Sequence, residues 1–127
     1  GEGADRNFSS RVQAVVTMGA PGDMAELYHQ TTSAPQRVVD LLGGTPDQVR
    51  RRYMLASPLN YVSADDPPVM LIHGDKDTKI PTAQAIKLDS KMTEVGQVHE
   101  LVLKKDAGHK KFPLDEQVWS FFEQHLR

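Results

Sequence analysis

A strand–helix–strand pattern in the second half of the chain leaves it few possible folds. Two apolar runs, Val69–Ile72 and His99–Leu103, flank the segment Thr82–Val95, in which apolar residues recur at helical spacing. Gly96 follows this segment at the position where glycine commonly ends a helix. The connection between the two runs is long enough for a parallel crossover, so the pattern predicts a βαβ unit within a parallel sheet.

Two further elements extend this unit. The run Val12–Met18 is rich in β-branched residues and nearly continuous in apolarity, which predicts a buried strand that ends at Gly19. A last helix is expected at about Asp115–Leu126, where apolar residues return at helical spacing. The predicted fold class is α/β, with parallel strands and flanking helices, and the 127 residues suffice for one domain.

The segment at about 23–58 has a different character. It is helical in pattern but divided into short pieces that are rich in turn residues, which is typical of a cap-like insertion. One helix is expected to stop at Gly43. A second is expected to open at Thr45, which can cap the amide of Gln48 while the Gln48 side chain returns the bond. The basic run Arg50–Arg52 is interpreted as a solvated helix face.

The composition narrows the possible partners. The 15 Lys and Arg residues against 17 Asp and Glu leave no basic excess for a nucleic acid or an anionic bilayer. Apolar runs of five residues or fewer fall far short of the roughly 20 that a membrane span needs. The absence of cysteine excludes a cysteine nucleophile and thiolate metal sites. We expect no nucleic-acid or membrane partner and no cofactor, while the cellular compartment stays open.

An acid and an imidazole follow the ends of two neighbouring predicted strands. Asp77 lies in the loop after Val69–Ile72, and His109 lies in the loop after His99–Leu103, where Gly108 would let the backbone turn and present the ring. In an open parallel sheet the ligand crevice lies outside the carboxyl ends of the strands, so these side chains can meet. A hydrolytic triad needs a carboxylate that orients an imidazole, and Asp77 and His109 fit those two roles.

The residues around these loops resemble the C-terminal part of an α/β-hydrolase. The motifs that carry the similarity are Ser57–Pro58, Pro67–Pro68, His73–Gly74–Asp75–Lys76–Asp77, Ile80–Pro81 and Ala107–Gly108–His109. The similarity spans roughly residues 12–126 and is closest to the esterase and lipase branch, which has dienelactone-hydrolase and carbohydrate-esterase relatives. The resemblance implies that Asp77 is the catalytic acid and that His109 is the catalytic base.

One part of that family's pattern is missing from the chain. The family's nucleophile is a serine in the motif G-x-S-x-G, which precedes the acid and the histidine, and no such motif occurs here. We therefore expect residues 1–127 to be a single C-terminal segment of a serine hydrolase, with the acid and histidine loops in 67–127. Alone it would be inactive. With its serine-bearing half it would cleave small acyl or carbohydrate esters.

Two other functions fit the same residues. A prolyl-oligopeptidase-type serine peptidase shares the Ser-Pro turn and the HGxxD loop, and a hydrolase-like module without catalysis could serve in binding or assembly. A three-stranded sheet would also leave an uncovered edge at the strand Val12–Met18. We expect either the missing N-terminal half or a second copy of the chain to pair with that edge.

The candidate residues also have simpler interpretations. Asp77 could cap the following helix, and His109 could be a surface residue of its loop. Asp23 is a candidate for lining a substrate pocket, although a cap on the next helix competes with that role. Asp75 and Asp77 form an Asp-x-Asp pair, but no further ligands lie at calcium-loop spacing, so no metal site is expected.

Overall fold

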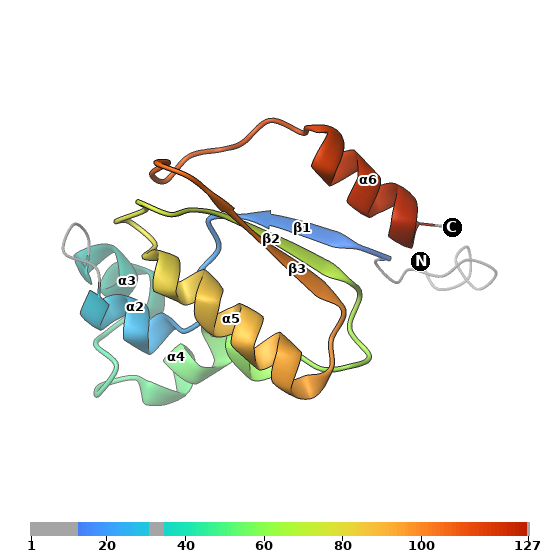
Figure 1. Ribbon diagram of the computed structural model, residues 1–127. Helices are drawn as coiled ribbons and strands as arrows, with labels where there is room; N and C mark the ends of the chain where they lie inside the picture. Colours follow the sequence, from blue (N-terminus) through green and yellow to red (C-terminus); the bar gives the residue numbers. More distant parts are fainter. Residues whose placement is uncertain (1–12, 31–34, 127) are drawn as a thin grey trace, which may run out of the picture.

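The computed structural model describes residues 13–30 and 35–126, and the predicted strand residue Val12 lies outside them. Three parallel strands form one sheet in the order β1-β2-β3, with α5 on one face and α6 on the other (Figure 1). The elements are β1 Val15–Met18, α2 Met24–Gln30, α3 Pro35–Leu42, α4 Arg50–Ala56, the 3₁₀ helix η1 Pro58–Tyr61, β2 Val69–Gly74, α5 Thr82–Val95, β3 His99–Lys104 and α6 Glu116–His125. The predicted α/β class with parallel strands is confirmed.

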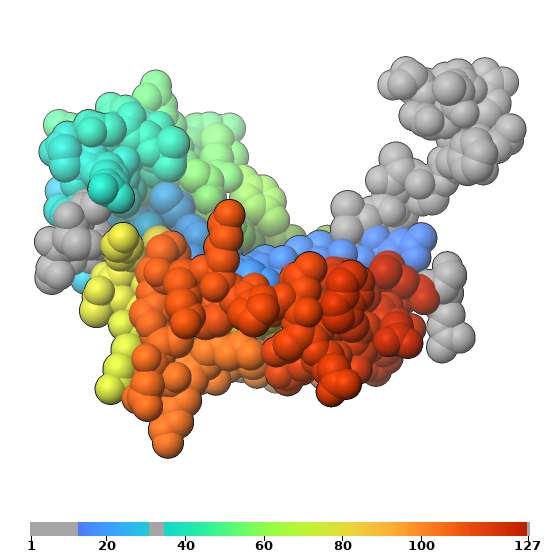
Figure 2. Space-filling view, turned by 90° about the horizontal axis from the view of Figure 1, so that it is seen from above, coloured from blue at the N-terminus to red at the C-terminus, as the bar shows by residue number. Residues whose placement is uncertain are grey.

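The central strand β2 is buried along its whole length. Val69 pairs with Val15 of β1 on one side and with His99 of β3 on the other, and the register continues in parallel from there. A strand covered on both faces can be uniformly apolar, which explains the unbroken run in the sequence. Among the described residues β1 pairs with β2 alone, and it stays visible beside α6 in Figure 2, at the edge of the sheet.

The helix α5 has the bounds that its apolar spacing predicts. Its buried residues Leu88 and Met92 pack against Val69 and Leu71 on one face of the sheet. Gly96 ends the helix in the left-handed conformation, with φ of 80°, which glycine adopts at little cost. The strand–helix–strand prediction is therefore confirmed.

The helix α6 covers the opposite face of the sheet. Val118 and Phe121 pack against Met70 and Ile72 of β2. Asp115 caps this helix, because its Oδ1 accepts a hydrogen bond from the Val118 amide at 3.1 Å. That bond and the nearby Lys104 ammonium hold the pKa of Asp115 below its ordinary value. No helix within the described ranges has the length and apolarity that a membrane span requires.

The cap-like segment holds one correction to the sequence prediction. Thr45 and Gln48 form the expected reciprocal bonds, at 3.0 and 3.3 Å, but they close a single turn and not a helix. Val49 then leaves the helical region, with φ of −131° and ψ of 51°, and α4 begins only at Arg50. The capping box is thus present, and the predicted helix start at Thr45 is wrong. Gly43 does end α3, with φ of 88°.

The helices of this segment share a small core of their own. Its buried members are Met24, Leu27, Val38 and Tyr53. The Tyr53 hydroxyl donates to a backbone carbonyl, that of Gly44, at 2.8 Å, and burial raises the pKa of this tyrosine. The segment therefore packs as a separate layer beside α5 (Figure 1).

Candidate active site

The loops after β2 and β3 bring Asp77 and His109 into contact. His109 Nδ1 lies 2.8 Å from Asp77 Oδ2. Because an ionised carboxylate can only accept, Nδ1 carries the proton of the neutral ring, and Nε2 is left as the proton acceptor. The Asp77 side chain is 1% exposed, whereas that of His109 is 37% exposed. The pair thus has a buried acid and an imidazole whose second nitrogen can meet another molecule.

Hydrogen bonds fix the Asp77 carboxylate on both of its oxygens. Oδ1 accepts from the amides of Lys79 and Ile80 at 3.0 and 2.9 Å, which is a turn within the loop. Oδ2 faces His109, and His73 Nε2 lies 3.4 Å from the same oxygen while bonded to the Ile80 carbonyl at 2.6 Å. Asp77 therefore organises its own loop and still presents one oxygen to His109.

Gly74 allows the two loops to approach each other. A side chain at this position would place its Cβ 2.2 Å from the Ala107 carbonyl oxygen and 2.5 Å from that of Gly108, so both contacts are with backbone. The expected role of Gly108 is wrong, because the left-handed residue in the second loop is Asp106, with φ of 58°. The turn that presents His109 therefore lies three residues before it.

The residue that follows β1, Gly19, lies against the His109 ring, and the sequence did not indicate this contact. Gly19 has φ of 69°, and a Cβ there would lie 2.9 Å from His109 Cε1 and 3.0 Å from Nδ1. The backbone of Gly19 therefore lies directly against the imidazole ring. In the sequence this glycine marks only the end of a strand, and its contact joins residues 90 positions apart.

The Asp75–Asp77 pair does not form a shared cation site. Asp75 Oδ1 accepts from the Asp106 amide at 2.7 Å, and Asp77 points to His109. No group of three or more residues that could hold a metal ion occurs in the part of the chain that the structure describes.

Asp23 has both of the roles that its position suggested, because it caps a helix and lines a pocket. Its Oδ1 accepts from the Glu26 amide at 3.0 Å, and its Oδ2 lies 2.9 Å from Lys87 Nζ. Burial raises the pKa of Asp23, but the hydrogen bonds from Glu26 and Lys87 outweigh burial and leave the pKa below its ordinary value. The pKa of Lys87 is raised in turn by the hydrogen bonds that Lys87 donates to Glu26 and Asp23.

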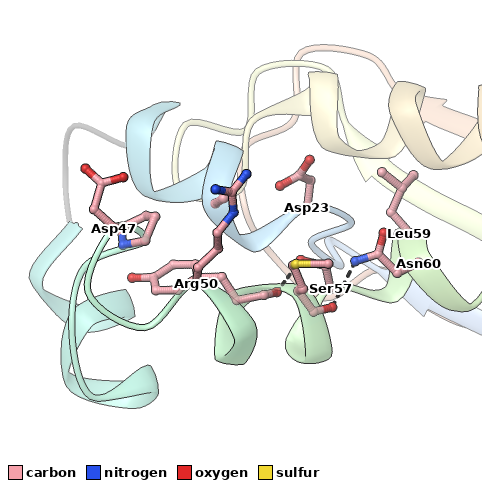
Figure 3. Close-up of a pocket in the computed structure, with 10 residues that line it drawn as sticks. Asp23, Asp47, Arg50, Ser57, Leu59 and Asn60 are labelled. Atoms are coloured by element: carbon pink, nitrogen blue, oxygen red, sulfur yellow. Dashed lines mark hydrogen bonds between the residues drawn. The ribbon is translucent and has the colours of Figure 1, made fainter.

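The pocket beside Asp23 has a volume of about 400 Å³ and lies between α2, α4 and η1 (Figure 3). The Arg50 side chain rises into it between Asp47 and Asp23. Within the described ranges the side chains of Arg50 and Asp47 make no hydrogen bond or ion pair, and both residues are exposed, whereas the Ser57 hydroxyl accepts from the Met24 amide and donates to the Tyr53 carbonyl. Among the described side chains that line the pocket, Arg50 is therefore an unpaired cation and Asp47 an unpaired anion. Arg50, Arg51 and Arg52 are all exposed, as the prediction of a solvated helix face requires, and Arg50 also lines this pocket.

Comparison with known proteins gives a consistent result. The model of the BD-FAE family matches residues 2–92. The uncharacterized peptidase YtmA of Bacillus subtilis is 29% identical over 88 residues, which cover 69% of this chain and 34% of that protein. Esterase LipQ of Mycobacterium tuberculosis is 29% identical over 68 residues, which cover 54% of this chain and 16% of that protein. The chain thus spans about a third or less of these curated relatives.

Solved structures share the fold. A truncated form of a carbohydrate esterase from gut microbiota is 30% identical, with a TM-score of 0.75 over 93% of this chain and 44% of that one. The uncomplexed acylaminoacyl peptidase of Pyrococcus horikoshii is 18% identical, with a TM-score of 0.79 over 96% of this chain and 22% of that one, and it supports the fold alone.

Proposed function

Because the chain belongs to the BD-FAE family of esterase-like α/β-hydrolases, we propose that it is the C-terminal part of a serine hydrolase that cleaves carboxylic esters. The observation that carries the proposal is the hydrogen bond of 2.8 Å between His109 Nδ1 and Asp77 Oδ2. It joins a buried carboxylate to an imidazole whose Nε2 is left to accept a proton, as the acid–base half of a triad requires.

The proposed reaction has two stages, and His109 moves a proton in each. In the first stage a serine hydroxyl attacks the ester carbonyl and passes its proton to His109 Nε2. The bond to the alcohol then breaks, and Nε2 returns the proton to the leaving oxygen. In the second stage water attacks the acyl-serine by the same route and releases the acid. Asp77 stabilises the imidazolium in both stages.

We place the serine outside this chain, in sequence that precedes residue 1. The chain lacks G-x-S-x-G, and in this fold the serine comes before the acid and the histidine. The chain also aligns with only 44% of the carbohydrate esterase structure, so that protein has more than half of its length outside the match.

The pocket between α2, α4 and η1 supports a carbohydrate ester as substrate. Arg50 and Asp47 offer a donor and an acceptor of opposite charge, which suits a neutral group with several hydroxyls better than an ion. Met54 and Leu59 add apolar lining, against which the face of a sugar ring can pack. The carbohydrate esterase at 30% identity is in agreement with this substrate class.

The test uses the protein together with its N-terminal half. We expect cleavage of p-nitrophenyl acetate and of an acetylated xylose glycoside, and a loss of at least about 10³-fold in kcat for His109→Ala. His29→Ala is the control, because His29 is exposed and lies outside both the pair and the pocket. Full turnover by His109→Ala would contradict the proposal.

A serine peptidase of the prolyl-oligopeptidase type is the alternative function, and the match to the peptidase YtmA favours it. The same assay separates the candidates. Faster cleavage of an aminoacyl p-nitroanilide than of either ester would indicate a peptidase. No turnover of any substrate would indicate a binding module without catalysis.

A further inference from the structure

Gln84 is a buried polar residue that the proposed mechanism does not use. It lies in the first turn of α5 and is 1% exposed. Its Oε1 accepts hydrogen bonds from the amides of Gly22 and Asp23, both at 2.8 Å, and its Nε2 donates to Gln30 Oε1 at 2.9 Å. An amide with three buried or half-buried partners is a fixed group, because each lost bond would leave a polar atom without water.

The segment that Gln84 holds is the one that lies against His109. Gly19–Asp23 connects β1 to α2, and its first residue donates from its amide to the Ile72 carbonyl at 2.9 Å. At the other end a Cβ on Gly22 would lie 2.7 Å from Leu88 Cγ, so the segment lies directly on α5. One end of this short segment therefore contacts the imidazole, and the other end is bonded to Gln84.

From this arrangement we infer that Gln84 is a positioning residue of the active site. It fixes the Gly19–Asp23 segment, and the backbone of Gly19 in turn holds the His109 ring in line with Asp77. Gln84 touches neither the substrate nor the reacting atoms. The functional consequence rests on the proposed hydrolase activity, whereas the effect on the His109 ring can be measured without it.

A purely structural role explains less of the geometry. Lys87 already links α5 to α2 through Asp23 and Glu26, so the two helices stay joined without Gln84. An apolar side chain of similar volume would fill the same space. Only an acceptor at this place supplies a partner for two adjacent amides, the buried one of Gly22 and the half-buried one of Asp23. Both amides belong to the segment whose first residue contacts the imidazole.

The test compares two substitutions at Gln84 with a matched control. Gln84→Met keeps the volume and removes the acceptor, and we expect kcat to fall about 10- to 100-fold with KM nearly unchanged. Gln84→Glu keeps the acceptor, and we expect kcat within about threefold of the original, since two amides favour a carboxylate. The control is Gln97→Met, because Gln97 is also buried and donates to the Pro67 carbonyl at 3.0 Å, at the other end of the strands.

A second measurement does not depend on activity. The NMR signal of the His109 Nδ1 proton reports its hydrogen bond to Asp77, and we expect it to broaden or move upfield in Gln84→Met. It should stay unchanged in Gln97→Met. If the protein cleaves no ester, the proposed function fails, and this signal still decides whether Gln84 positions the ring.

The outcomes that would overturn the inference are specific. Equal kcat and equal His109 signals in Gln84→Met and Gln97→Met would do so, and so would a Gln84→Glu variant as impaired as Gln84→Met. If Gln84→Met fails to fold, Gln30→Met replaces it. This change removes the bond from Gln84 and the bond from Gln30 to Glu26, and it leaves the bonds of the Gly22 and Asp23 amides to Gln84 in place. For that variant we expect about a threefold loss of kcat and a broadened His109 signal, and an unchanged signal would contradict the inference.

Discussion

The two oxygens of the Asp77 carboxylate have different hydrogen-bond partners and different roles. Oδ1 holds the loop through the amides of Lys79 and Ile80, and Oδ2 accepts from His109. Replacement by asparagine can keep the first set of bonds while it presents an NH₂ group to the imidazole. The ring would then turn or change tautomer, and the chemistry would be lost without loss of the fold.

Asp77→Asn should therefore separate activity from stability. We expect kcat to fall about 10⁴-fold, as loss of the correct imidazole tautomer implies, with little change in Tm. Steady-state kinetics with p-nitrophenyl acetate and thermal unfolding measure the two effects. Asp40→Asn is the control, because Asp40 is exposed and, among the described residues, its side chain bonds only to the Gln36 side chain of its own helix. A large fall in Tm for Asp77→Asn would show that its role is structural.

A methyl group at Gly19 should displace the imidazole. Its Cβ would lie 2.9 Å from His109 Cε1, and the positive φ adds backbone strain of about 1 kcal/mol. We expect Gly19→Ala to lower kcat about 100-fold. Gly96→Ala is a matched control with φ of 80° and no atom within 4 Å of the added carbon, so it carries the strain without the clash. Equal activity of the two variants would contradict the role of Gly19 in holding the His109 ring.

At the scale of elements, local sequence patterns predicted the structure correctly where a segment's own residues determine it. The bounds of α5 follow from its apolar spacing and Gly96, and the pair Asp77–His109 follows from the order of strand and loop. The predicted helix start at Thr45 was wrong because a capping box can close a single turn that no helix follows. The roles of Gly19 and Gln84 depend on contacts between residues more than 60 positions apart, which no local pattern encodes.

The ion pair between α2 and α5 should give a measurable pH dependence. The pKa of Asp23 is lowered in the fold, so its contribution is present above its unfolded pKa and is lost as the pH falls through the folded value. The pKa of Lys87 is raised, so its contribution is present below its unfolded pKa and is lost as the pH rises through the folded value. Their joint effect is therefore largest between about pH 5 and pH 9.

Lys87→Met removes this ion pair together with the ion pair between Lys87 and Glu26. We expect it to lower the free energy of unfolding by about 0.5 kcal/mol at pH 7, because both side chains are partly exposed, and by less at pH 3. Urea unfolding at the two pH values measures the difference. Lys91→Met is the control, since within the described part of the chain Lys91 pairs only with Glu94 of its own helix. A difference of the same size at both pH values would exclude the ionic explanation.

Arg50→Ala tests the pocket between α2, α4 and η1. Loss of the free guanidinium should raise KM for an acetylated xylose glycoside about tenfold and leave turnover of p-nitrophenyl acetate unchanged, because the small ester has no sugar to bind. Arg51→Ala is the control, since Arg51 does not line the pocket. If Arg50→Ala changed the kinetics of both substrates equally, or of neither, the pocket would not be part of the substrate-binding site.

At the scale of the whole molecule, the open edge of β1 calls for a partner. The amides of Val15 and Gly19 donate toward β2, so those of Val16 and Met18 point to the open side. We propose that a strand of the N-terminal half pairs there, with a second copy of the chain as the alternative. Light scattering of the chain, alone and with that half added, distinguishes the two.

A proline at this edge should weaken the pairing. Val16→Pro removes an outward amide and leaves the bonds to β2 in place, so we expect association about tenfold weaker. Leu103→Pro is the control, because the alternation in β3 also directs this amide outward, at the opposite edge. Equal loss of binding in both variants would show that the β1 edge is not the contact.

The close backbone contact at Gly74 has a consequence for how related sequences are judged. Any side chain there would push against two carbonyl groups and drive the loops of Asp77 and His109 apart. A homologue with alanine or serine at this position would retain every reactive group and still lack a working acid–base pair. A comparison of the reactive side chains alone would classify such a protein as an enzyme. Only the side chain in place of glycine at this position would show that the pair cannot form.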